Sequence, residues 1–129
     1  QKIQFSGAVN PLYIIKDNEL NIIKADIWSI GGGGLNRPNT KYTERNFTCH
    51  ELILDDRAQY FMFSDGFIDQ FGGKNNRKFN KKRFDQLLID ISPLSAKEQK
   101  LQLEHKMDAW MKTSKNGQID DMLVLGFKI

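Results

Sequence analysis

Two consecutive helices, set in a chain that otherwise has the pattern of strands, constrain the fold of this sequence most strongly. The first helix is predicted from apolar residues at i, i+3, i+4 and i+7, namely Phe84, Leu87, Leu88 and Ile91. Asn80 is a suitable N-cap for it, and Pro93 ends it. The second helix begins at a capping box formed by Ser95 and Glu98. Its apolar face is made by Leu103, Met107, Trp110 and Met111.

Short apolar strands are predicted on both sides of the helix pair. Asp17 and Asn18 join two of them in a tight hairpin, because Asp and Asn tolerate the positive φ angles of such a turn. The predicted strands cover residues 3–5, 12–15, 20–23, 47–54, 60–63 and 122–129. A βαβ repeat would place a strand between the helices. The predicted helices follow each other directly, and this order of elements indicates one α+β domain over residues 1–129, with antiparallel pairing.

Composition excludes several classes of protein. The 129 residues are 40% hydrophobic and 27% charged, which suits one globular domain with a buried core. No apolar run approaches the ~20 residues of a membrane span, so we expect no membrane contact by this segment. Cys49 is the single cysteine, which excludes an internal disulfide and suits a reducing compartment. We expect Cys49 to be a small apolar core residue.

Two short acidic motifs carry the chemistry of the sequence. Asp65 follows the apolar run 60–63, and Asp120 and Asp121 precede the last predicted strand. Asp69 lies four residues after Asp65, so one helical turn would place both on the same face. Carboxylates at strand ends are suitable ligands for Mg²⁺ or Mn²⁺, and such ions activate water for attack on phosphorus. The alternatives are a plain Asp-Gly turn at Asp65 and a solvated helix residue at Asp69.

Other candidate sites have simpler interpretations. Without a histidine and cysteine cluster a zinc site is not expected, so His50 and His105 are interpreted as surface or packed residues. Residues 31–34, four glycines, lack the context of a P-loop and are interpreted as a flexible connection. The basic run 74–83 contains one aromatic residue, Phe79, so we expect a solvated loop and no nucleic-acid binding. A secondary interpretation is that the basic run 74–83 docks an acidic or phosphorylated partner protein.

The acidic motifs and the segment between them resemble a known family. Residues 63–73 (Phe-Ser-Asp-Gly-Phe-Ile-Asp-Gln-Phe-Gly-Gly), 78–79, 82–84 and 120–124 resemble the SpoIIE-like (RsbU-like) branch of the PPM metal-dependent serine/threonine phosphatases. Residues 5–12 and 54–56 resemble further segments of that family. The resemblance covers nearly the whole chain in the right order.

The resemblance implies a fold and an activity. The fold would be an antiparallel β-sandwich flanked by helices, with a two-metal site for Mn²⁺ or Mg²⁺ at one end. Asp65 and Asp120 match the two C-terminal metal ligands of the family, and Asp69 matches a position that helps to hold a third, weaker metal. The implied reaction is hydrolysis of phosphoserine or phosphothreonine by a metal-activated water. The implied substrate is a phosphorylated signalling protein such as an anti-sigma-factor antagonist.

The same resemblance implies a setting. Such a domain follows a sensor or repeat module, and its location would be cytoplasmic, with any membrane tether in upstream segments.

Two departures from the family limit these expectations. Asn10 stands where the family often has histidine, and the Gly-Asp-x-x-Gly-His-Gly motif that bridges both metals is missing. The chain is therefore expected to be the C-terminal portion of a phosphatase domain, incomplete in its N-terminal strands and weak or inactive alone. The alternative is a non-catalytic, degenerate phosphatase module that binds a signalling partner. Missing strands would also leave an apolar edge that favours self-association.

Overall fold

The computed structural model describes residues 1–30 and 46–129, and the glycine run at 31–34 lies outside the described residues. The elements are β1 (Lys2–Phe5), β2 (Leu12–Lys16), β3 (Glu19–Ile23), β4 (His50–Ile53), β5 (Gln59–Phe63), α1 (Gly66–Asp69), β6 (Phe71–Gly72), β7 (Arg77–Lys78), α2 (Lys81–Ile91), α3 (Ala96–Met111) and β8 (Val124–Phe127). Every paired strand is antiparallel to its neighbour, so the predicted α+β class is confirmed.

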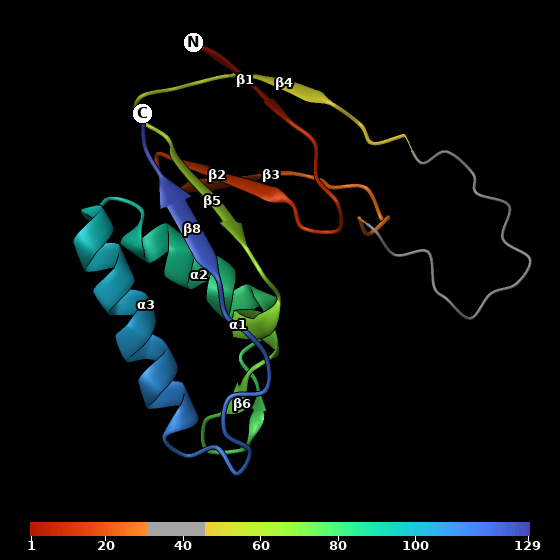
Figure 1. Ribbon diagram of the computed structural model, residues 1–129. Coiled ribbons are helices and arrows are strands. Elements are labelled where there is room, and N and C mark those ends of the chain that lie inside the picture. Colours follow the sequence, from red (N-terminus) through yellow and green to blue (C-terminus); the bar gives the residue numbers. More distant parts are fainter. Residues whose placement is uncertain (31–45) are drawn as a thin grey trace, which may run out of the picture.

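The main sheet has four strands in the order β3-β2-β5-β8. The predicted hairpin joins β2 to β3, and its turn residues Asp17 and Asn18 take φ angles of 50° and 64°. β5 lies inside the sheet and is buried on both faces, as its continuous apolar sequence predicts. β8 returns from the helices to pair with β5, so the last strand of the chain lies at one edge of the sheet (Figure 1).

The helices cover one face of this sheet and enclose an aromatic core. Phe84 on α2 is fully buried, with ring centroids 4.7 Å from Phe63 and 4.9 Å from Phe67. Tyr13 from β2 meets Phe63 edge-on at 4.8 Å. Both predicted caps are present: the Asn80 side chain accepts the Arg83 N–H, and α3 begins at a complete capping box. These aromatic contacts therefore connect β2 to β5 and β5 to α2.

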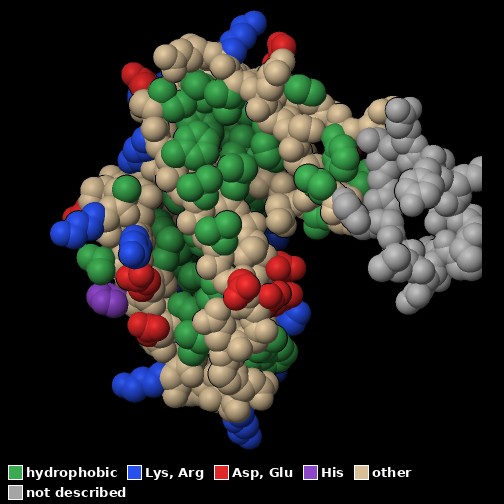
Figure 2. Space-filling model, viewed as in Figure 1, with side chains coloured by type: hydrophobic (Ala, Val, Ile, Leu, Met, Phe, Trp, Pro, Cys, Tyr) green, Lys and Arg blue, Asp and Glu red, His purple; other side chains and the backbone are tan. Residues whose placement is uncertain are grey.

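The opposite face of the sheet is covered by a two-stranded ribbon of β1 and β4. Phe5 and Leu52 from the ribbon pack against the buried Leu12 and Tyr60 of the main sheet. The ribbon is far smaller than the sheet that it covers. Figure 2 accordingly shows a broad area of hydrophobic side chains at the surface over this part of the molecule. The architecture is a sandwich with one full layer of strands and one partial layer.

Two expectations about this region are wrong. The strand predicted over residues 47–54 is limited to His50–Ile53, and Cys49 is exposed rather than part of the core. The alternation of β4 explains the exposure, because Cys49 shares the parity of Glu51 and Ile53, which face solvent. The chain before β4 is instead held to Asp26, whose carboxylate accepts two hydrogen bonds from Thr48.

The described helices include none that is long and apolar enough to cross a membrane.

Replacing Phe84 by alanine should lower the free energy of unfolding by about 3–5 kcal/mol, because it removes a buried ring that joins α2 to β5. Chemical denaturation measures the change. Leu101→Ala on α3 is the control: its side chain is 42% exposed, and the expected cost is within about 0.5 kcal/mol. Equal losses for both variants would contradict the placement of the core.

The ion pair between Lys16 and Asp55 predicts a pH dependence. The Lys16 ammonium and the Arg57 backbone N–H lower the pKa of Asp55 from 3.8 to about 2. Because the folded pKa is the lower one, the stabilisation is present above pH 3.8 and is lost as the pH falls toward 2. Urea unfolding should therefore separate the wild type from Asp55→Asn at neutral pH and not at pH 2. Asp56→Asn, which keeps both contacts, is the control.

Candidate functional site

The register of β5 and β8 brings the two acidic motifs to one end of the sheet. Phe63 is opposite Val124 in the ladder, and the pairing continues as the Ser64 N–H donates to the Leu123 carbonyl at 3.0 Å. Asp65 follows Ser64 on one strand, and Asp120 and Asp121 lie just before Leu123 on the other. Segments 55 positions apart in the sequence therefore meet at a strand end, as the sequence pattern predicts.

The Ser64 side chain fastens the two segments together. Its Oγ–H donates to the Asp121 carbonyl at 2.9 Å, and the same oxygen accepts the Leu123 N–H at 3.0 Å. One hydroxyl thus satisfies two main-chain groups beyond the last ladder pair. Ser64 acts as a positioning residue for the second acidic motif.

Gly66 allows the close approach of these segments. α1 begins at Gly66, and a Cβ added there would collide with the Asp121 carbonyl oxygen. The α1 turn closes with the Asp69 N–H donating to the Asp65 carbonyl at 2.9 Å. Glycine is needed here for space, since the backbone of the second motif occupies the position of a side chain.

Gln70 holds the segment that leads into Asp120. Its side chain is fully buried, and its amide N–H donates to the Gly117 carbonyl at 2.9 Å. Its Oε1 accepts the Ile119 N–H at 3.1 Å. The Gln70 carbonyl in turn accepts the Trp110 indole N–H at 3.1 Å. Sequence reasoning missed this residue, because a lone glutamine forms no motif and the side-chain partners Gly117 and Ile119 lie 47 and 49 positions away.

The carboxylates themselves differ in their surroundings. Asp65 and Asp120 are exposed, and the Asp120 carboxylate accepts the Asp121 N–H at 2.8 Å. Asp69 forms an ion pair with Lys78 at 3.0 Å. Residues 1–30 and 46–129 contain no group of three or more His, Cys, Asp or Glu side chains that could hold a metal ion. The structure joins the backbones of the two motifs, and metal ligation by Asp65, Asp120 and Asp69 stays a prediction.

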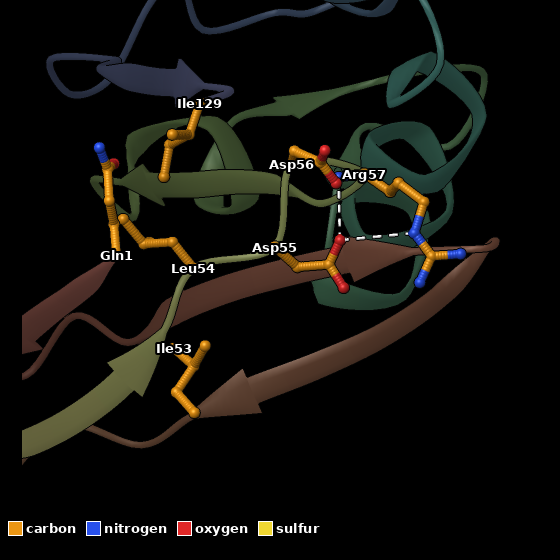
Figure 3. Close-up of a pocket in the computed structure, with 7 residues that line it drawn as sticks. All are labelled: Gln1, Ile53, Leu54, Asp55, Asp56, Arg57 and Ile129. Atoms are coloured by element: carbon orange, nitrogen blue, oxygen red, sulfur yellow. Dashed lines mark hydrogen bonds and ion pairs between the residues drawn. The ribbon is translucent and has the colours of Figure 1, made fainter.

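A hollow lies at the other end of β5. It measures about 730 Å³ and is lined by Gln1, Ile53, Leu54, Asp55, Asp56, Arg57 and Ile129 (Figure 3). Asp55 in its wall is engaged by Lys16 and Arg57, as Figure 3 shows for the arginine. Lys16 and Arg57 therefore neutralise the Asp55 carboxylate in this hollow. We therefore place the candidate site at the Asp65 end of the sheet.

Three cations of the basic run 74–83 make contacts within the fold. Lys78 pairs with Asp69, and Lys81 pairs with Asp85 on α2 at 2.6 Å. Arg83 lies 5.1 Å from the ring centroid of Trp110. Phe79, the one aromatic residue of the run, is fully buried in the core. The run therefore provides no exposed aromatic surface on which a base could stack.

The arrangement of these elements is that of part of a PP2C domain. The structure resembles the SiaA-PP2C domain of Pseudomonas aeruginosa with a TM-score of 0.82 and 24% sequence identity. The match covers 99% of this chain and 46% of that chain, so this chain spans less than half the length of its structural neighbour. No protein-family model and no curated protein matches the sequence. The likeness establishes the fold.

Replacing Gly66 by alanine should destabilise the chain by about 1–3 kcal/mol, because the new methyl group forces the Asp121 segment away from α1. Gly117→Ala is the matched control, since nothing lies within 4 Å of a Cβ added there. Denaturation gives the two stabilities, and amide exchange at Leu123 reports whether the contact with Ser64 loosens. A Gly66→Ala variant with unchanged stability and exchange would contradict the described approach of the two motifs.

Proposed function

We propose that this chain is the C-terminal part of a PPM-type protein serine/threonine phosphatase domain of the SpoIIE-like branch. The observation that carries the proposal is the junction of β5 and β8, where the Ser64 hydroxyl fastens Asp65 next to the Asp120 and Asp121 segment. This junction lies within a PP2C fold. The family motifs around Asp65 and Asp120 support the same interpretation.

The donor set fits a hard divalent cation. Asp65 and Asp120 offer exposed carboxylate oxygens, which are the ligands that Mg²⁺ and Mn²⁺ prefer. When bound, such an ion would supply a Lewis acid that lowers the pKa of water and neutralises charge on a phosphoryl group.

The remaining residues of the site position these two carboxylates. Ser64 and Gln70 fix the backbone on either side of Asp120, and Gly66 lets it approach α1. Asp69 is held by Lys78 in the described structure. A role for Asp69 in binding a third, weaker metal therefore requires that this ion pair open.

The substrate and the setting are proposed from the same resemblance. We expect a phosphoserine or phosphothreonine on a signalling protein, such as an anti-sigma-factor antagonist. We expect a sensor or repeat module upstream in the parent polypeptide and a cytoplasmic location. Nucleic acid is not an expected partner.

Asp65→Asn in the parent protein should lower Mn²⁺-dependent phosphate release from a phosphoserine protein by several orders of magnitude, because the amide gives up the charge that holds the cation. Asp56→Asn, an acidic residue at the other end of β5, should leave the rate unchanged. Near-normal activity of Asp65→Asn would contradict the assignment of the site. We expect the 129-residue chain alone to bind Mn²⁺ weakly and to turn over poorly.

The second candidate is a non-catalytic phosphatase module that binds a signalling partner. It is favoured by the lack of any three-residue metal-binding group within residues 1–30 and 46–129. The Gly-Asp-x-x-Gly-His-Gly motif distinguishes the two candidates. Its presence upstream of Gln1 in the parent favours the enzyme, and its absence there favours the binding module.

A further inference from the structure

The segment that carries Asp120 has no regular secondary structure of its own. It connects α3 to β8, and no helix or strand lies between these two elements. The main-chain groups of such a segment need partners from elsewhere in the fold. One side chain supplies two of them, because the Gln70 amide N–H donates to the Gly117 carbonyl at 2.9 Å and the Gln70 Oε1 accepts the Ile119 N–H at 3.1 Å.

Gln70 itself is fixed on several sides. Its side chain is fully buried, and its amide N–H also donates to the Phe71 carbonyl at 3.1 Å. Moving a buried amide with three hydrogen bonds would leave polar groups unpaired, which is costly. The Gln70 carbonyl accepts the Trp110 indole N–H at 3.1 Å. One residue is therefore bonded both to α3 and to the segment before Asp120.

Trp110 is held closely in the last turn of α3. Its carbonyl accepts the Gly73 N–H at 3.0 Å, and a Cβ added at Gly72 would collide with the same carbonyl oxygen. The indole ring lies edge-on to Phe79 with ring centroids 5.3 Å apart, and the Arg83 guanidinium lies 5.1 Å from its centroid. A displacement of this turn would therefore disturb several contacts, including the hydrogen bond of the indole.

The Asp120 carboxylate lies next to this support. Ile119, which is bonded to Gln70, precedes it directly, and the Asp121 N–H donates to the Asp120 Oδ1 at 2.8 Å. The Asp121 carbonyl accepts the Ser64 Oγ–H at 2.9 Å. The backbone around the carboxylate is thus held by Gln70 on one side and by Ser64 on the other. Of these two residues, Gln70 is the one bonded to Trp110 of α3.

We propose that Trp110 and Gln70 are positioning residues that couple the packing of α3 to divalent-cation binding at Asp65 and Asp120. A ligand carboxylate must be held in a defined orientation, and residues that support ligands affect metal affinity. The coupling is reciprocal, so loosening the last turn of α3 lowers the affinity for the cation, and the cation stabilises the packing of Trp110. This inference rests on the proposed function, which assigns the cation to these carboxylates.

An NMR titration of the 129-residue chain with Mg²⁺ tests the coupling. We expect the amide signals of Asp65 and Asp120 to shift as Mg²⁺ is added. The Trp110 indole N–H signal should shift with the same midpoint, although the indole is not a ligand. The indole N–H of Trp28, on the segment after β3, is the internal reference and should not shift. If Trp110 only stabilised the fold, its signal would not follow the cation.

Two variants test the hydrogen bonds of this connection. Gln70→Leu removes both bonds to the segment before Asp120, and Trp110→Phe keeps an aromatic ring but removes the donor to Gln70. Gln70→Leu should weaken Mg²⁺ binding by about tenfold, and Trp110→Phe by a smaller factor. Circular dichroism confirms that the variants fold.

Gln99→Leu is the matched control for these variants. Gln99 is also buried and also donates to main-chain carbonyls, those of Ser92 and Leu94. Its bonds lie at the turn between α2 and α3 and not beside Asp120. Gln99→Leu should therefore leave the Mg²⁺ affinity unchanged, even if it lowers the stability of the chain.

Amide hydrogen exchange without any cation gives an independent measurement. Trp110→Phe should speed the exchange of the Ile119 and Asp121 N–H groups, both of which are hydrogen-bonded beside Asp120. The Leu123 N–H, which is held from the other side of the segment, is the reference and should exchange as in the wild type.

The outcomes separate this inference from the proposed function. If the Asp65 and Asp120 signals shift while the Trp110 indole does not, and all variants bind Mg²⁺ equally, the coupling is overturned and the cation site stands. If neither amide signal shifts, the cation site is contradicted and hydrogen exchange decides the positioning role. Unchanged exchange in Trp110→Phe overturns that role, and faster exchange limited to Ile119 and Asp121 supports it.

Discussion

The antiparallel pairing of β5 with β8 is the interaction on which the rest of this structure depends. It joins the last strand of the chain to the buried centre of the sheet, and its register decides which residues meet beyond the ladder. A slip of one residue would turn every β8 side chain to the opposite face and separate Asp120 from Asp65. The Ser64 hydroxyl fixes this register at the end where the acidic motifs lie.

The same pairing links the core to the candidate site. β5 contributes Phe61 and Phe63 to the aromatic core under the helices and Tyr60 to the smaller core under the ribbon. α3 reaches the site through Trp110, whose indole binds the carbonyl of Gln70. Gln70 then holds the segment before Asp120. Helix packing therefore helps to position the segment that carries Asp120, although Asp120 itself lies outside the helices.

The features of the fold that depend on neighbouring residues could be predicted from the sequence. The hairpin at Asp17, the capping box at Ser95 and the meeting of the two strand ends next to Asp65 and Asp120 follow from local sequence signals, and the structure has all three. Long-range pairings were not predictable. The burial of Gln70 and the ion pair of Asp69 with Lys78 depend on partners that the sequence does not mark. The expectation that Cys49 lies in the core was wrong, because a single apolar residue does not indicate which face of a strand it occupies.

Paramagnetic line broadening by Mn²⁺ in the NMR spectrum of the 129-residue chain tests the central claim most directly. If the β5 and β8 strand ends form one side of a cation site, substoichiometric Mn²⁺ should broaden the amide signals of Asp65, Gly66, Asp120 and Asp121 first. The Asp65→Asn variant should lose this selectivity. Broadening that begins elsewhere, for example at Asp55 and Asp56, or that spreads evenly over all exposed carboxylates, would contradict the account.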